Sequence, residues 1–377
     1  MPPVTLVCPV SKVALRRTDV DEADAASGAL VAPDMTGHRP VGRTQQVELR
    51  ADGGGAYPVL RGIPVVLVPE MLSPLRGHEV DVTVAPYEEA YSELEHYSSS
   101  AAEEAEQVDS SSALAHLRAV RSGPARHAFP EPPEPWLDMK YDMPAQVDAF
   151  RHLSPIDGAA VLQLGGRGLQ AVKMLLAGAR EAWVATPMVG ELLYAVALAE
   201  AVGVADRLHC VAALAEELPF PDRSFDAVYA QGSVHHWVVD RALPECARVL
   251  VDGGRFAAVE PWRGPLYGIG TGILGKRDRG VQCVVLTPSR IRPPLAQSFP
   301  GARIVHHGVL SRYALLALKK ARISFSHRTV WRLSTLDDRL VSRSARLRDQ
   351  GSSVAILATA GSRPSDAGDR RVRGASR

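Results

Sequence analysis

The sequence predicts an α/β protein built on a doubly wound, largely parallel sheet, and two observations support this. Residues 159–162 form an unbroken apolar run that leads into a glycine-rich turn, and apolar residues at helical spacing follow it. This order is typical of the first half of a β-α-β unit. Strand-like and helix-like segments then alternate as far as residue 260, and such alternation specifies helices packed on both faces of a parallel sheet.

Length and composition limit the possible classes of protein. The chain has 377 residues, 46% of them hydrophobic, which suits two domains or one enlarged domain with an ordinary core. A formal net charge of +1 gives no electrostatic indication of a nucleic-acid partner. Four widely spaced cysteines, Cys8, Cys210, Cys246 and Cys283, predict reduced thiols. Because no apolar run has the length of a membrane span and no signal peptide is recognisable, we expect a cytoplasmic protein without a membrane partner.

Residues 1–72 are predicted to form a small β module. Val4–Lys12 and Ala56–Val68 read as short strands joined by a polar connection. The Tyr-Pro-Val-Leu-Arg-Gly-Ile-Pro-Val run in the second segment, together with Cys8, resembles the Trm112-like and YcaR-like zinc-ribbon family. That resemblance implies a second cysteine where Ser11 stands, and structural zinc needs four Cys or His ligands. We therefore expect a degenerate, metal-free module.

Residues 73–154 are predicted to form a helical lid and linker. The stretch Ser110–Pro135 is rich in Ser, Pro and Gly and reads as exposed. A helix is expected over Pro144–Leu153. Tyr141 and Asp142, which precede this helix, are candidate substrate-binding residues of the lid.

Residues 155–360 are predicted to form the main domain, and residues 361–377 a disordered tail. The expected strands span residues 159–162, 182–185, 208–211, 225–229, 255–260, 302–308 and 353–358. The expected helices span residues 189–202, 242–250 and 313–320, and a further helix begins after Gly168.

The most informative motif in this domain is Glu-Leu-Pro-Phe-Pro-Asp-Arg-Ser-Phe-Asp-Ala-Val-Tyr over Glu217–Tyr229, followed by Val-His-His-Trp over Val234–Trp237. Together with the helix-to-strand turn Arg248–Phe256, it resembles the class I S-adenosylmethionine-dependent methyltransferases, in particular their quinone-biosynthesis-like branch. The resemblance covers Pro155–Pro265. It implies a Rossmann-like fold and S-adenosylmethionine as a candidate cofactor.

The resemblance also implies a cofactor site around the glycine turn. Its candidate residues are Gln163, Gly165, Gly166, Gly168 and Glu216. Three polar positions of the family are replaced, because Gln163 stands at the acidic position of the first strand, Ala185 at the ribose-binding acid and Leu214 at the adenine-binding Asp. A hydrogen bond to a charged group contributes about 1.5–3 kcal/mol, so the loss at the ribose alone weakens binding by tens-fold or more. We therefore expect a degraded cofactor site, and we expect no metal.

Candidate catalytic residues follow the fourth and fifth strands, because ligands of an open α/β sheet bind at the carboxyl ends of its strands. They are His235, His236 and Glu260, since a histidine exchanges a proton near neutral pH and a carboxylate can orient it. Adjacent residues of an extended segment point in opposite directions, so one histidine of the pair is expected to pack inward. Further candidates for substrate binding have aromatic or cationic side chains: Arg167, Trp237, Trp262, Arg263 and Tyr267.

The sequence therefore predicts an enzyme of methyltransferase fold that acts on a small molecule, free or bound to a carrier or partner protein, in specialised biosynthesis. The favoured hypothesis is a non-methylating ring closure, displacement or elimination, because three cofactor contacts are replaced together. One alternative is ordinary methyl transfer, with Glu181, Glu191 or Gln163 as replacement contacts. A second alternative is a non-catalytic partner or activator subunit, suggested by the ribbon-like N-terminus.

Overall fold

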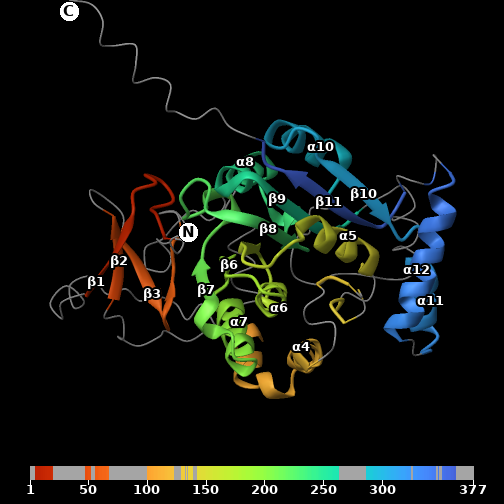
Figure 1. Ribbon diagram of the computed structural model, residues 1–377, viewed down its shortest axis with the longest axis horizontal. Coiled ribbons are helices and arrows are strands. Elements are labelled where there is room, and N and C mark those ends of the chain that lie inside the picture. Colours follow the sequence, from red (N-terminus) through yellow and green to blue (C-terminus); the bar gives the residue numbers. More distant parts are fainter. Residues whose placement is uncertain are drawn as a thin grey trace, which may run out of the picture.

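The computed structural model contains two sheets, a four-stranded antiparallel sheet near the N-terminus and a larger seven-stranded sheet (Figure 1). The described residues are 5–19, 47–51, 56–67, 100–122, 129–131, 133, 135–138, 142–262, 286–323, 326–344, 347 and 350–361. Within these ranges, no helix has both the length and the apolarity that crossing a membrane requires.

The seven-stranded sheet has the order β10-β11-β9-β8-β5-β6-β7, and this confirms the predicted doubly wound α/β fold. Its strands are β5 (Ala160–Leu164), β6 (Glu181–Thr186), β7 (Leu208–Ala212), β8 (Phe225–Gln231), β9 (Leu250–Pro261), β10 (Arg303–His307) and β11 (Ser353–Thr359). Five of them, β5 to β9, pair in parallel, whereas β11 runs antiparallel to both β9 and β10. Because β5 lies between β6 and β8, the strand order reverses there, and a ligand crevice is expected at the carboxyl ends of these strands.

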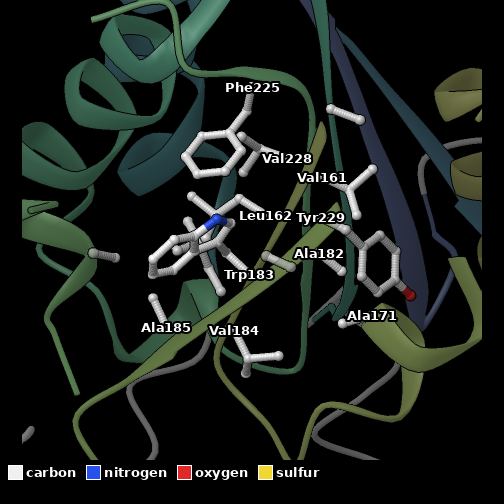
Figure 2. Packing of buried hydrophobic residues seen from close by; sticks show 14 of the residues in the cluster. Val161, Leu162, Ala171, Ala182, Trp183, Val184, Ala185, Phe225, Val228 and Tyr229 are labelled. Atoms are coloured by element: carbon white, nitrogen blue, oxygen red, sulfur yellow. The ribbon is translucent and has the colours of Figure 1, made fainter. Parts of the chain in front are cut away.

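Helices cover both faces of this sheet (Figure 1). On one face lie α5 (Met143–Leu153), α6 (Leu169–Leu176) and α7 (Val189–Ala201), and on the other lie α8 (Val239–Val249) and α10 (Pro288–Ser298). Figure 2 shows Trp183 and Tyr229 on opposite sides of the sheet. The Trp183 ring packs edge-on against Phe220 at 5.2 Å between centroids, and the Tyr229 ring lies 5.6 Å from Phe150 of α5. Each face thus has its own aromatic contact with the layer that covers it.

The turn between β5 and α6 depends on glycine. Gly165, Gly166 and Gly168 have φ values of 77°, 70° and 75°, a left-handed conformation that other residues rarely adopt. A Cβ atom on Gly168 would lie 2.3 Å from the Cβ of Ala195, which belongs to α7. The glycine therefore allows α6 to start directly against α7.

The segment that we expected to form a lid and linker contributes helices to the core instead. α4 (Ser112–Ser122) lies inside the stretch that we interpreted as exposed, and it buries Leu114, Leu117 and Val120. The serine-rich start of this stretch caps a helix, because the hydroxyl of Ser111 accepts a hydrogen bond from the amide of Leu114 at 3.1 Å. α5 packs against β9 and β11. α5 therefore covers the main sheet directly, whereas α4 packs on the outside of α6 and α7.

The N-terminal module is a meander of four strands, β1 (Leu15–Asp19), β2 (Val47–Ala51), β3 (Ala56–Leu60) and β4 (Ile63–Pro64). The strand expected over Val4–Lys12 does not form, because the chain turns at Pro9–Ser11 and pairs only through an isolated bridge between Val7 and Ala14. The thiol of Cys8 lies 3.1 Å from the hydroxyl of Tyr57. No group of three His, Cys, Asp or Glu residues suited to a metal occurs among the described residues. The zinc-ribbon resemblance and the absence of zinc both stay predictions.

Two helices lie between the last two strands along the chain. α11 (Ser311–Lys320) and α12 (His327–Val341) lie between β10 and β11. Leu315 of α11 and Val330 of α12 pack against Met143 and Val147 at the start of α5. This pair of helices therefore packs at the start of α5, and α12 also lies against β10.

Candidate functional site

A pocket of about 290 Å³ lies at the carboxyl ends of β5, β6, β7 and β8. The polar or aromatic residues that line it are Thr186, Glu191, Glu216, Gln231, Ser233, His236 and Trp237, and the turn glycines Gly165 and Gly166 form part of its wall. A larger, more open groove of about 830 Å³ runs along edge strand β10, but it contains none of the predicted site residues. The smaller pocket is the candidate site, because it sits at the crossover point of the sheet.

Gln163 holds the glycine turn together. Its Oε1 accepts a hydrogen bond from the amide of Ala171 at 2.8 Å, and its Nε2 donates to the carbonyl oxygen of Gly165 at 2.9 Å. Both ends of this buried amide are thus used between β5, the turn and the first turn of α6. Glu181, a suggested replacement contact, begins β6 at the far end from the pocket and pairs with Arg180 at 2.9 Å.

Glu191 places a carboxylate beside the end of β6, the strand on which Ala185 replaces the acid that the family resemblance implies. β6 ends at Thr186, and the hydroxyl of Thr186 donates to Oε2 of Glu191 at 3.3 Å. Glu191 lies in the first turn of α7, and both residues line the pocket. The acidic group therefore comes from the helix that follows β6 rather than from the end of the strand.

Glu216 supplies a second carboxylate to the pocket wall. It follows β7, is 8% exposed, and its Oε1 accepts a hydrogen bond from the amide of Val238 at 2.7 Å. This contact ties the segment after β7 to the segment after β8. The pocket wall therefore carries two carboxylates, those of Glu191 and Glu216.

His235 and Glu260 form a buried dyad. Oε2 of Glu260 lies 2.7 Å from Nδ1 of His235, and Oε1 accepts hydrogen bonds from the amides of Ser233 and Val234 at 2.9 Å each. Glu260 is 1% exposed and His235 7% exposed. A carboxylate bound by two backbone N–H groups acts as an acceptor, so Nδ1 carries the proton and Nε2 keeps its lone pair. Among the described residues Nε2 has no hydrogen-bond partner, and His235 itself lies directly behind the pocket-lining His236 rather than on the pocket wall.

His236 and Trp237 follow directly and line the pocket. The rings of His235 and His236 lie 4.0 Å apart between centroids. One histidine therefore packs inward as expected, since His235 is bound to a buried carboxylate and His236 lies on the pocket wall. The segment is a 3-10 helix, Val234–His236, and not the extended backbone that we assumed.

The remaining predicted residues lie elsewhere. Arg167 does not line the pocket, because its guanidinium pairs with Glu104 and lies 5.7 Å from the ring centroid of Tyr194. Trp262 is 1% exposed and packs edge-on against His306. Asp142 immediately precedes α5 and is half-buried. Tyr141, Arg263 and Tyr267 lie outside the described residues.

The sequence analysis missed a buried polar cluster behind the pocket. The fully buried Nζ of Lys173 donates to Oδ1 of Asp138 at 2.7 Å and to the carbonyl oxygen of Trp136 at 2.8 Å. Burial lowers the pKa of Lys173 despite the nearby carboxylate. Burial alone would raise the pKa of Asp138, but the charge of Lys173 and the hydrogen bonds of Gln146 and Gln170 outweigh it and lower that pKa. Lys173 precedes the apolar Leu176 by three residues, and residues three apart lie on the same face of a helix. This spacing could have predicted that Lys173 is buried.

Comparison with known proteins agrees with this reading. A family described as "Methyltransferase domain" matches residues 166–258. The ubiquinone/menaquinone biosynthesis C-methyltransferase UbiE of Brucella anthropi is 41% identical over 101 residues, which cover 26% of this chain and 38% of that relative. The same enzyme of Brucella abortus is 40% identical over 101 residues. The chain thus spans well under half the length of these curated relatives.

Solved structures give weaker likenesses. A geranyl diphosphate methyltransferase in complex with GPP and sinefungin has 19% identity and a TM-score of 0.42, covering 57% of this chain and 76% of that one. The [4+2]-cyclase SpnF has 20% identity and a TM-score of 0.39, covering 58% of this chain and 80% of that one. Residues 166–258 thus match a methyltransferase domain, and the sheet order is that of a Rossmann-like α/β fold.

Proposed function

We propose that this protein binds S-adenosylmethionine in the 290 Å³ pocket and methylates a small molecule of specialised biosynthesis, free or bound to a carrier protein. The observation that carries the proposal is the Thr186–Glu191 pair on the pocket wall. It supports cofactor binding because a carboxylate can accept hydrogen bonds from both hydroxyls of a ribose.

The other residues of the pocket fit the same cofactor. When bound, S-adenosylmethionine supplies an electrophilic methyl group carried on a cationic sulfonium. Glu191 and Glu216 line the pocket with negative charge, and the ion pair with Glu104 offsets the charge of Arg167 beside the glycine turn. The left-handed glycines let a ligand approach the backbone closely. These features support cofactor binding despite the three replaced positions.

The dyad supplies the chemistry of the acceptor. Nε2 of His235 takes a proton from an O–H, N–H or acidic C–H group of the substrate, and Glu260 stabilises the imidazolium that forms. Hydrogen bonds from the amides of Ser233 and Val234 keep Glu260 in place during this transfer. The chain therefore generates the nucleophile with its own buried groups.

A second candidate function is a non-methylating ring closure, displacement or elimination. The observation that favours it is that the dyad is complete without any cofactor atom, so a positioned substrate could react by proton transfer alone. Incubation with methyl-labelled S-adenosylmethionine and a panel of phenols, enols and amines separates the two functions. Labelled product supports methyl transfer, and an unmethylated isomer or elimination product supports the second candidate.

The first test is calorimetry with S-adenosylmethionine and S-adenosylhomocysteine. We expect dissociation constants below about 100 μM, which corresponds to roughly −5.5 kcal/mol. Glu191→Gln should weaken binding about 10-fold, because a hydrogen bond to a charged group becomes a neutral one. Glu181→Gln is the matched control, since it removes a buried carboxylate at the opposite end of β6 and should leave both constants unchanged. Wild-type binding weaker than about 100 μM for both compounds contradicts the proposal.

A further inference from the structure

A chain of buried polar side chains starts at the Lys173–Asp138 ion pair and leads toward the pocket. Oδ1 of Asp138 accepts a hydrogen bond from Nε2 of Gln146 at 2.6 Å, and the amide of Asp138 donates to Oε1 of Gln146 at 3.1 Å. A backbone N–H can only donate and a carboxylate can only accept. The side-chain amide of Gln146 therefore has a single orientation that satisfies both contacts.

The orientation of Gln146 in turn fixes that of the Gln231 side chain at the end of β8. Oε1 of Gln231 lies 2.6 Å from the hydroxyl of Tyr229 and 3.5 Å from Nε2 of Gln146. Because Nε2 of Gln146 is a donor, the oxygen of Gln231 faces it, and the Tyr229 hydroxyl donates to the same oxygen. Burial, with the charges of Asp138 and Glu260, raises the pKa of Tyr229 well above its ordinary value. The hydroxyl therefore stays protonated and remains a donor.

Because Oε1 of Gln231 faces Tyr229 and Gln146, its amide nitrogen Nε2 points away from these two residues. Figure 2 shows Tyr229 on the side of the sheet away from Trp183 and Phe225, with its hydroxyl beyond the strands. Gln231 itself lines the pocket, and within the described residues its Nε2 has no acceptor. The cluster thus presents a donor of fixed direction to whatever the pocket binds.

We propose that Nε2 of Gln231 donates a hydrogen bond to a carboxylate of the ligand bound in this pocket, an inference that rests on the proposed function. The acceptor Glu191 follows β6 and the donor Gln231 ends β8, with β5 between these strands. Two strand spacings separate the two ends by about 10 Å. A nucleoside whose hydroxyls meet Glu191 and whose amino-acid carboxylate meets Gln231 satisfies both. Gln231 is then a specificity-determining residue for the amino-acid part of the cofactor.

The test compares two probes that differ in that carboxylate. S-adenosylhomocysteine has it, and 5′-methylthioadenosine has the same nucleoside without the amino-acid group. Gln231→Leu should weaken binding of S-adenosylhomocysteine roughly 10-fold or more and change that of 5′-methylthioadenosine less than about 2-fold. Gln231→Glu should weaken S-adenosylhomocysteine further than Gln231→Leu does, because it sets a carboxylate against a carboxylate.

Remote variants test how Gln231 is oriented. Tyr229→Phe and Gln146→Leu each remove one donor to Oε1 of Gln231, so each should give a smaller, selective loss for S-adenosylhomocysteine. Gln170→Leu is the matched control, because Gln170 donates to the same Asp138 carboxylate at 3.0 Å and makes no contact with Gln231 among the described residues. It should bind both probes as the wild-type protein does.

The outcomes separate the two proposals. If wild-type protein binds S-adenosylhomocysteine and both Gln231 variants bind it equally well, the Gln231 inference is overturned while the proposed function stands. Equal losses for both probes also overturn it, because they indicate a damaged pocket rather than a lost carboxylate contact. If wild-type protein binds neither probe, the proposed function fails and the inference fails with it.

Discussion

His235 and His236 are neighbours in the chain, but the structure gives them different surroundings. His235 is bound by the buried carboxylate of Glu260, whereas His236 stands on the pocket wall. Glu260 uses its other oxygen to hold the backbone of the turn that bears both histidines. A single carboxylate therefore fixes the position of the turn and the tautomer of the base at once.

We predict that His235→Ala lowers turnover about 100-fold or more, the usual contribution of a general base. Turnover is measured with a substrate that the labelling assay finds to react. The rate should be measured together with the thermal midpoint, so that loss of the base is distinguished from unfolding. His209→Gln serves as the control, because His209 is a half-exposed histidine of β7 away from the dyad and its replacement should leave turnover unchanged. Wild-type turnover in a normally folded His235→Ala protein would show that the dyad is not the base.

The dyad could be predicted from the sequence, whereas Glu191 could be named only as one of three possible replacement contacts, and the reason is geometric. His235 and Glu260 both follow predicted strands, and strand ends of a parallel sheet meet at one edge. Glu191 lies five residues after Thr186, on the next helix, so only the path of the turn brings it back to the strand end. Asp138 was missed because it precedes α5 in a segment without a periodic pattern.

At the scale of elements, the strands and helices of the parallel sheet were predictable because apolar runs and turn glycines mark them. α10 was missed because Pro293 and Pro294 lie inside it and read as helix breakers, although the hydroxyl of Thr287 caps its first turn. α12 was missed although Val330, Leu333 and Leu340 recur at helical spacing and Ser326 caps its first turn, so its sequence did carry a usable signal. β11 enters the sheet between β9 and β10 and runs antiparallel to both, an arrangement that local sequence patterns do not specify.

His307 joins three of these elements. Its Nδ1 lies 2.7 Å from Oδ2 of Asp338 on α12, and its Nε2 lies 3.0 Å from Oδ2 of Asp148 on α5. Burial alone would lower the pKa of this histidine, but hydrogen bonds and charge attraction from the two carboxylates raise it to about 9. A protonated His307 therefore pins the end of β10 to both helices at neutral pH.

We predict that the protein loses stability between about pH 6.5 and about pH 9. The folded-state pKa lies above the unfolded value, so the stabilisation is fully present below pH 6.5 and is lost as the pH rises through 9. The full effect is on the order of 3 kcal/mol. Denaturant unfolding at several pH values measures it, and His307→Gln should flatten the slope in this window.

Two matched variants sharpen that measurement. Asp148→Asn and Asp338→Asn each remove one charge while keeping the shape of the side chain, so each should reduce the slope in part. The pKa values of His152 and His209 are lowered, mainly by burial, so these residues titrate below the window. A slope that is the same in wild-type and His307→Gln proteins would mean that His307 does not hold the helices in this way.

At the scale of the whole molecule, the N-terminal module continues the main sheet. The amide of Val66 donates to the carbonyl oxygen of Ala212 at 2.8 Å, and Val65 forms a parallel bridge with Ala212 at the open edge of β7. Val65, Val66 and Leu67 are 0%, 1% and 0% exposed. Ala213 and Leu214, the two residues that follow β7, line the pocket. The module therefore covers a sheet edge that would otherwise expose unpaired backbone beside the site.

We predict that residues 63–67 and β7 open as one cooperative unit. Native-state hydrogen exchange should give both segments the same opening free energy, because the apolar side chains of the segment 63–67 lie in the main core. Val211→Ala removes two buried methyl groups from β7 and should lower both values together by about 2 kcal/mol. Val10→Ala makes the same chemical change at a residue that is 64% exposed, and it should lower neither. If Val211→Ala speeds exchange in residues 208–212 while residues 63–67 keep their protection, the module is an independent domain rather than the outer layer of this sheet.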